Sequence, residues 1–312
     1  MALCLITSCP PLQSMKRDFF DFFFDGEARR HLFGAITQAL AEDGEDKTSD
    51  AVFGPEDALS ACIVAKSDAV LAGLPLIPII LDETLPEKLS LPCETEIPFS
   101  DGERVQKGEV LARIRGGARR ILKAERVILN FICHLSGIAT LTARYVQELE
   151  GTGVTLLDTR KTLPGLRYPE KYAVLMGGAQ NHRKNLEEML MLKDNHIDRA
   201  GSITAAVEKL RETYAPCPPI EAECRNPAEV REAVALKVDR LMLDNMGPGE
   251  LREALPLIPA DIETEISGGV SLESIRSLAL ASGTRPTFIS VGRLTHSAAY
   301  ADFSMRIEKG AQ

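Results

Sequence analysis

The second half of the chain alternates short apolar runs with longer segments of helical periodicity. The apolar runs predict six strands, TLLD (155–158), MLMLK (189–193), PIEAE (219–223), RLMLD (240–244), IETEI (262–266) and TFISVG (287–292). Several of them are separated by predicted helices, such as residues 202–214, 226–236 and 271–280. Strands that alternate with helices in this way are typical of a parallel sheet or barrel. Since a full TIM barrel has eight strands, we expect an incomplete, TIM-like parallel α/β barrel of about six to seven strands.

The first half combines two helical patterns with short strands. Residues 19–40 and residues 125–150 carry apolar side chains at three- and four-residue steps, and Ser136-Gly137 is a candidate break or cap in the second of these helices. The runs that predict strands are residues 51–54, 60–68, 69–73, 78–81 and 101–116. This half is therefore expected to form an α/β sandwich domain.

The turn spacing of residues 101–116 is also seen in lipoyl- and biotinyl-carrier domains. Those domains carry a modified lysine at the tip of a hairpin between two strands, and this region offers no convincing lysine in that setting. We infer shared strand-turn geometry only. The predicted domains are residues 15–130 with a tail of about 295–312, and a catalytic barrel of 131–294; residues 1–14 are an extension to which we assign no role.

Composition limits the class of function. The chain has 312 residues and a formal net charge of -9, which argues against nucleic acid or an anionic membrane as the main partner. The seven cysteines are scattered without a C-x-x-C pair, as expected for reduced thiols in a cytoplasmic protein. The sequence has no uninterrupted apolar run of transmembrane length and no basic region ahead of its first apolar residues, so we expect neither a membrane span nor a secretory signal.

Polar side chains stand at the ends of nearly all the predicted strands of the second half. They are Asp158 to Lys161, Lys193, Asp194, Glu221, Glu223, Asp244, Asn245, Glu265, Ser267, Ser290 and Gly292. Any one of them could cap a helix or anchor a loop. Because active sites of parallel βα folds are assembled at the carboxyl ends of the strands, the set as a whole predicts a catalytic site there.

Two of these strand ends are candidate phosphate sites. Ser267, Gly268 and Gly269 lead into a predicted helix, whose first backbone N–H groups can bind an anion. Ser290 and Gly292 follow the last strand, and barrels commonly bind phosphate between their last two βα loops.

Six motifs resemble those of the quinolinate phosphoribosyltransferases, in the family's order and at similar separations. They are DTRKTLPGLRYPEKYAV (158–174), the GG-x-x-NHR step (177–183), KDNHI (193–197), LDNM (243–246), EISGG (265–269) and SVGRLTHS (290–297). Weaker similarity continues upstream through residues 124–140, so the resemblance covers nearly the whole chain beyond about residue 30. It implies an incomplete barrel, and transfer of phosphoribose from phosphoribosyl pyrophosphate to quinolinate with loss of CO₂.

The resemblance also implies a role for each matching charged residue. Residues expected to hold the two carboxylates of quinolinate are Arg160, His182, Arg183, Lys193 and, from a neighbouring subunit of a homodimer or higher oligomer, Arg126. From the residues alone, Arg126 would be assigned to a surface ion pair with Glu125. The catalytic candidates are Lys161, Glu223 and Asp244, and the last two, with help from Glu221 and Glu265, are expected to hold ribose hydroxyls and Mg²⁺.

Two other interpretations remain open from the sequence. One is a related phosphoribosyltransferase-like protein associated with molybdate transport, which shares the overall pattern. The other is a catalytically silent barrel that binds sugar phosphates. The density of cations in residues 159–167 and 193–196 favours an enzyme that binds a dicarboxylate.

Overall fold

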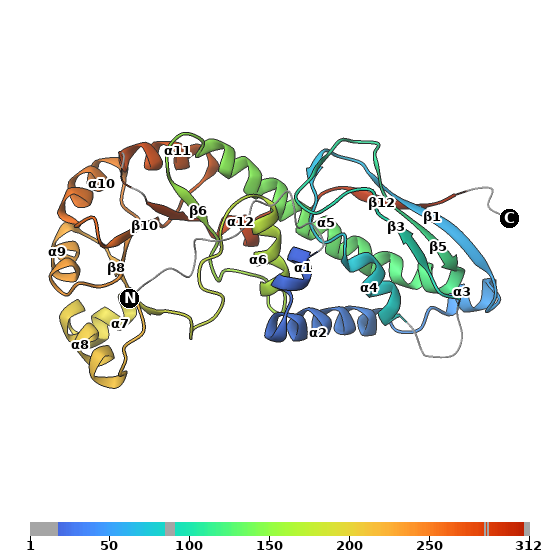
Figure 1. The fold of residues 1–312 in the computed structure, drawn as a ribbon, viewed down its shortest axis with the longest axis horizontal. Helices are drawn as coiled ribbons and strands as arrows, with labels where there is room; N and C mark the ends of the chain where they lie inside the picture. Colours follow the sequence, from blue (N-terminus) through green and yellow to red (C-terminus); the bar gives the residue numbers. More distant parts are fainter. Residues whose placement is uncertain (1–17, 85–90, 284, 286, 309–312) are drawn as a thin grey trace. The chain divides into compact units, whose positions relative to one another are not determined.

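The computed structural model describes residues 18–84, 91–283, 285 and 287–308, and the extension predicted at residues 1–14 lies outside them. The described chain forms two compact units (Figure 1). The first contains residues from Met1–Thr140, Pro164–Met176 and Ala299–Gln312, and the second contains Leu141–Leu163 and Gly177–Ala298. These units group residues by contact, and where the folding domains begin and end stays a prediction.

The first unit is built on an antiparallel sheet of four strands in the order β12-β1-β5-β3. Its elements are α1 (Asp18–Phe23), α2 (Gly26–Asp43), α3 (Lys47–Val52), β1 (Ala58–Ala65), β2 (Ala69–Val70), α4 (Leu76–Glu83), β3 (Glu94–Glu96), β4 (Arg104–Val105), β5 (Val110–Gly117), the first part of α5 (Ala118–Glu148), α6 (Arg167–Met176) and β12 (Phe303–Ile307). Strand β12 comes from the end of the chain and pairs with β1, so that Ala61 lies opposite Ile307. The sheet and the helices that pack on it give the predicted α/β sandwich.

Three expectations for this unit were wrong. Residues 51–54 were expected to form a strand, but residues 51 and 52 end helix α3, whose start is fixed by the Asp46 side chain as it accepts the Ser49 N–H at 3.0 Å. Residues 78–81 belong to helix α4 and not to a strand, because Leu76, Ile77, Ile80 and Leu81 lie on one helical face and are all buried. The helix predicted over residues 19–40 is interrupted between α1 and α2. There the side chain of Asp25 accepts a hydrogen bond from the Gly26 N–H at 2.7 Å and begins a new helix.

Helix α5 runs without interruption through Ser136 and Gly137, where the sequence offered a break. The Ser136 hydroxyl lies against the backbone of Ala72, whose N–H it accepts at 3.0 Å. A Cβ atom on Gly137 would lie 2.1 Å from the carbonyl oxygen of Ala299. This pair of small residues therefore serves close packing inside the helix rather than its end.

Helix α5 is also the only described element that is long and apolar enough to cross a membrane, judged by length and composition. In its most apolar window 72% of the residues are buried. A core helix meets the same two criteria, so this is weak evidence for a membrane span.

The second unit is the predicted incomplete parallel barrel. Its elements are β6 (Thr155–Leu157), β7 (Leu190–Leu192), α7 (Asp194–Ala200), α8 (Ile203–Thr213), β8 (Ile220–Cys224), α9 (Pro227–Ala235), β9 (Arg240–Asp244), α10 (Pro248–Ala254), η1 (Leu255–Leu257), β10 (Glu263–Ser267), α11 (Leu272–Ala281), β11 (Phe288–Ser290) and α12 (Arg293–His296). The six strands lie in the order β6-β11-β10-β9-β8-β7, and a single parallel bridge adds Gln180 beside Leu157. All six strands predicted from the sequence are confirmed. Helices α8 to α11 lie outside the sheet in Figure 1.

Candidate active site

One face of the parallel sheet carries polar side chains in rows, because alternate residues of a strand point to the same side. Adjacent strands align these residues as Glu221, Arg240 and Glu263, then Glu223, Met242 and Glu265, then Asp244 and Ser267. Glu221 and Glu265 are fully buried, whereas Glu223, Asp244 and Ser267, nearer the carboxyl ends of the strands, are partly exposed. The strand ends therefore present polar groups to solvent above a buried charged layer.

Glu223 and Asp244 form an acidic pair at this end of the sheet. Burial of Glu223 and the neighbouring charge of Asp244 raise the pKa of Glu223 to about 7, while Lys193 acts in the opposite direction. Asp244 accepts a hydrogen bond from the side chain of Asn245 at 2.6 Å. A half-buried carboxylate next to a second carboxylate forms a good site for a divalent cation with a preference for oxygen, so these residues fit Mg²⁺.

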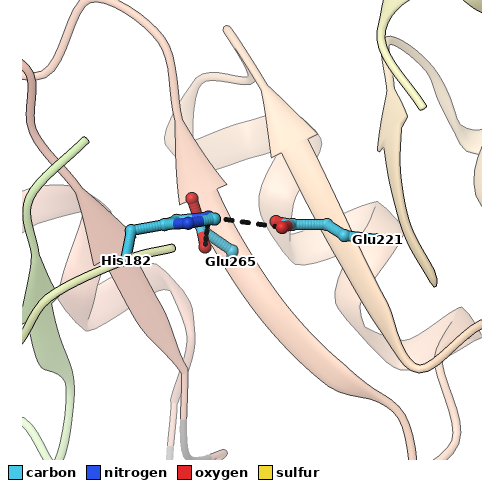
Figure 2. Close-up of side chains that lie close together, drawn as sticks. All are labelled: His182, Glu221 and Glu265. Carbon is cyan, nitrogen blue, oxygen red and sulfur yellow. Dashed lines mark ion pairs between the residues drawn. The ribbon is translucent and has the colours of Figure 1, made fainter. Parts of the chain in front are cut away.

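His182 lies between two buried glutamates. Its Nε2 is 3.2 Å from an oxygen of Glu221 and 3.3 Å from an oxygen of Glu265, and Figure 2 shows the ring pointing toward both carboxylates. Burial disfavours the charged ring, but the two carboxylates outweigh it and raise the pKa of His182 to about 9. Glu265 is also 3.5 Å from Arg240, which forms a closer ion pair with Glu263 at 2.6 Å.

The turn that carries His182 is held by the end of β6. Asp158 is fully buried and accepts hydrogen bonds from the His182 N–H at 2.7 Å and from the Asn181 side chain at 2.9 Å. The Nδ1 atom of His182 accepts the N–H of Arg183 at 2.6 Å. The NHR step is thus fixed through both its backbone and its side chains.

Arg183 lies close to a second arginine. Burial and the nearby charge of Arg160 both lower the pKa of Arg183, with burial the larger effect. The Nη1 group of Arg183 donates to the carbonyl of Met189 at 2.8 Å, which limits how far the guanidinium can turn. Two neighbouring guanidinium groups repel each other, and an anion between or beside them removes that cost.

Lys161 lies against the loop that follows β11. Its carbonyl accepts a hydrogen bond from the Thr295 hydroxyl at 2.8 Å, and a Cβ atom on Gly292 would lie 2.8 Å from its Cδ. In the same region the Ser290 hydroxyl donates to the Ser267 hydroxyl at 2.9 Å. The structure therefore brings Lys161 together with the second candidate phosphate loop, and joins the strands that lead into both loops.

The first phosphate loop packs against the LDNM motif. The Asn245 N–H donates to the carbonyl of Ser267 at 2.9 Å, and both Asn245 and Gly268 have positive φ, 56° and 88°. A Cβ atom on Gly268 would lie 2.3 Å from the Asn245 side chain and 2.6 Å from its backbone nitrogen. Only glycine fits this position without a shift of the loop that carries Asp244.

Lys193 begins helix α7 and is exposed. Its N–H donates to His196 Nδ1 at 3.0 Å, which explains the histidine of the KDNHI motif as a support of the turn. Arg126 is exposed on α5 in the first unit. The partner contact expected of Arg126, like the substrate contacts expected of the other residues, stays a prediction.

Sequence reasoning missed Arg240 and left Glu221 and Glu265 among the groups expected to hold ribose or Mg²⁺. A side chain with no accessible surface can contact a substrate only after movement, and both glutamates have none. Alternation within E-A-E and E-T-E-I-S places these residues on the polar face, but their depth depends on how neighbouring strands are aligned. The available signal was a charged residue within each of these short strands.

Comparisons with known proteins point to the same family as the six sequence motifs. The family models for quinolinate phosphoribosyl transferase match over residues 46–136 for the N-terminal domain and 138–306 for the C-terminal domain. A probable nicotinate-nucleotide pyrophosphorylase (carboxylating) of Bacillus subtilis is 43% identical over 265 residues, which are 84% of this chain and 88% of that protein. A protein of the same name from Synechocystis is 40% identical over 276 residues, 87% of this chain and 91% of that protein.

Comparison with solved structures finds proteins of the same kind. The structure of NadC from Streptococcus pyogenes is 39% identical, with a TM-score of 0.81 over 88% of this chain and 95% of that one. The nicotinate-nucleotide pyrophosphorylase from Francisella tularensis is 32% identical, with a TM-score of 0.81 over 89% of this chain and 96% of that one. Family models, relatives and structures all cover most of the chain, which therefore belongs to the quinolinate phosphoribosyl transferase family.

Proposed function

We propose that this protein transfers phosphoribose from phosphoribosyl pyrophosphate to quinolinate, giving nicotinate mononucleotide, pyrophosphate and CO₂ in the biosynthesis of NAD. The pyridine nitrogen supplies the electron pair that bonds to C1 of the ribose, and pyrophosphate leaves with the electrons of the broken C–O bond. The 2-carboxylate then leaves as CO₂, its bonding electrons pass to the ring beside the positive nitrogen, and a proton from solvent takes its place. A pyridine lone pair needs no general base, and none is assigned.

The observation that carries this proposal is the hydrogen bond from the His182 N–H to Asp158 at 2.7 Å, because it joins the segment of Arg160 to the segment of Arg183. Quinolinate has two carboxylates on neighbouring ring carbons, and arginine holds a carboxylate through two parallel hydrogen bonds. The charge of Arg160 also lowers the pKa of Arg183, which supports binding of an anion by both residues. Lys193, whose charge acts on Glu223, can supply a third positive charge for quinolinate.

Glu223 and Asp244 are proposed to hold the ribose hydroxyls together with Mg²⁺, which neutralises charge on the pyrophosphate. Their own charges would also stabilise the positive charge that develops on the ribose carbon as pyrophosphate departs. The two phosphate groups are assigned to the loops at Ser267–Gly269 and Ser290–Gly292, with Lys161 beside the second loop.

The assembly and location of the protein are further parts of the proposal. We assign Arg126 to the active site of a neighbouring subunit, so that an isolated subunit lacks one substrate contact. The scattered cysteines and the acidic composition favour the cytoplasm. The relatives' names support neither a protein of molybdate transport nor a silent barrel.

The test is a mass-spectrometric assay of the purified protein with quinolinate, phosphoribosyl pyrophosphate and Mg²⁺, and with nicotinate in a parallel reaction. Nicotinate mononucleotide and CO₂ from quinolinate, with no nucleotide from nicotinate, is the expected result. Formation of no product from quinolinate would exclude the proposed reaction.

A further inference from the structure

The cluster around His182 is sealed from solvent, and the proposed function assigns none of its three residues to a substrate, although the sequence led us to expect substrate contacts from them. Glu221 and Glu265 have no exposed surface, and His182 is 6% exposed. Among the described residues, none of the four carboxylate oxygens has a hydrogen-bond partner with good geometry. The two glutamates come from β8 and β10, on either side of β9, and reach toward the same edge of the imidazole ring (Figure 2). Two buried carboxylates directed at one nitrogen favour a proton on that nitrogen.

The other ring nitrogen fixes the same tautomer. Nδ1 of His182 accepts the Arg183 N–H at 2.6 Å, so in the neutral ring the proton is on Nε2, facing the glutamates. The cationic ring also carries a proton on Nε2. The remaining tautomer would turn a lone pair toward Glu221 and Glu265 and an N–H toward the N–H of Arg183, which is unfavourable on both sides.

A metal ion is the alternative occupant of this cluster. One nitrogen and two carboxylate oxygens lie within 4.8 Å of one another, as a metal site requires. A metal on Nε2 would move the proton of the neutral ring to Nδ1, where it would meet the Arg183 N–H. The contact to Arg183 therefore favours a hydrogen-bonding role for the cluster.

We infer that Glu221 and Glu265 are positioning residues, which orient His182 and through it the backbone of Arg183. In this arrangement His182 supports the quinolinate-binding guanidinium rather than contacting the acid itself. The inference rests on the proposed function, since it assigns Arg183 to a quinolinate carboxylate. The acidic pair for the ribose is supported separately, because Asp244 is followed by the hydrogen bond from Asn245 to Ser267. Loss of a buried glutamate should therefore weaken quinolinate much more than phosphoribosyl pyrophosphate.

The test compares Glu221→Gln and Glu265→Gln with Glu263→Gln. Glutamine keeps the shape of the side chain and removes its charge. Glu263 is the matched control, because it lies on the strand of Glu265, points to the same face and pairs with Arg240 but not with His182. We expect the KM for quinolinate to rise about tenfold in the first two variants, because a displaced Arg183 would lose a charge-assisted hydrogen bond to the carboxylate of quinolinate. The KM for phosphoribosyl pyrophosphate, and both KM values of Glu263→Gln, should stay within about twofold.

A double-mutant cycle separates positioning from general destabilisation. If Glu221 acts through Arg183, then Glu221→Gln in an Arg183→Lys background should add little to the KM for quinolinate. Equal effects in both backgrounds, or equal rises of both KM values, would overturn the inference. No product from the unaltered protein would instead reject the proposed function.

A spectroscopic measurement covers the case in which the variants do not fold. Nitrogen-15 NMR of histidine-labelled unaltered protein should show a proton on Nε2 of His182 at neutral pH. A neutral ring protonated on Nδ1 would overturn the inference without any substitution. A Zn²⁺ titration of the same sample should leave the His182 signals in place, and their displacement by one equivalent would assign the cluster to a metal.

Discussion

Replacement of Gly268 by alanine tests whether the phosphate loop and the acidic pair are held in place by contact. The added methyl group would lie 2.6 Å from the backbone nitrogen of Asn245, whereas unbonded heavy atoms prefer about 3.5 Å. Rotation of the Asn245 side chain can relieve the contact with its oxygen but not the contact with its backbone. The loop that follows Asp244 must therefore move by close to 1 Å.

The expected loss has two parts. Alanine at a φ of 88° costs about 1–2 kcal/mol relative to glycine, because of its Cβ atom. The overlap with Asn245 adds about 1–3 kcal/mol, in the range seen for overpacked sites. A displacement of about 1 Å next to a catalytic group can lower the rate about 100-fold. We expect Gly268→Ala to lower both the free energy of unfolding and kcat/KM for phosphoribosyl pyrophosphate.

Gly269→Ala is the matched control. Gly269 also has a positive φ, 59°, but its Cβ atom would approach Asn245 no closer than 3.9 Å. This variant should show the conformational cost and not the displacement. Denaturant unfolding and steady-state kinetics of the two variants measure the difference. Equal losses in the two variants would refute the argument that contact with Asn245 positions Asp244.

Three further predictions concern the acids and the partner arginine. Because the pKa of Glu223 is raised to about 7, the folded state binds more protons than the unfolded state between pH 4.5 and 7. The contribution of Glu223 to stability is therefore present below pH 4.5 and is lost as the pH rises through 7. Glu223→Gln should flatten the dependence of the unfolding midpoint on pH, and an unchanged slope would contradict this cause. Removal of Mg²⁺ with a chelator should abolish turnover, and addition of Mg²⁺ should restore it. The Asp244→Asn variant should require more Mg²⁺ for its half-maximal rate. Full activity in the presence of the chelator would exclude a role for Mg²⁺ in the reaction. Mixing inactive Arg126→Ala subunits with inactive Lys161→Ala subunits should restore part of the activity, since a mixed oligomer contains one site with both Arg126 and Lys161 intact. If mixtures confirmed by mass to contain hybrid oligomers recover no activity, Arg126 lies outside the partner's site.

The barrel could be predicted from sequence because each of its strands is a short apolar run bounded by a helix, and that local pattern decides the structure. Residues 78–81 and Ser136-Gly137 were misread for the opposite reason. Leu76 and Ile77, outside the run that was read as a strand, complete a helical face, and Gly137 is small because Ala299, distant in the sequence, packs against it. Local patterns do not contain such distant contacts.

The candidate site also has one part that local sequence patterns predict and another that depends on contacts between distant segments. Motifs at strand ends predicted a site at Glu223, Asp244 and both glycine loops, since the carboxyl ends of parallel strands meet at one edge. The burial of Glu221 and Glu265 could not be predicted, because it depends on the alignment of β8, β9 and β10 and on the direction of the His182 ring. Only the structure relates these three residues.

The pairing of β1 with β12 has a consequence for the order in which the chain is made. The four-stranded sheet needs residues 303–307, which are synthesised after every strand of the parallel barrel. The barrel can therefore be complete while β1 still lacks a neighbour and exposes one edge. A C-terminal truncation that removes β12 would leave that edge open permanently, and exposed edges of this kind are where chains associate.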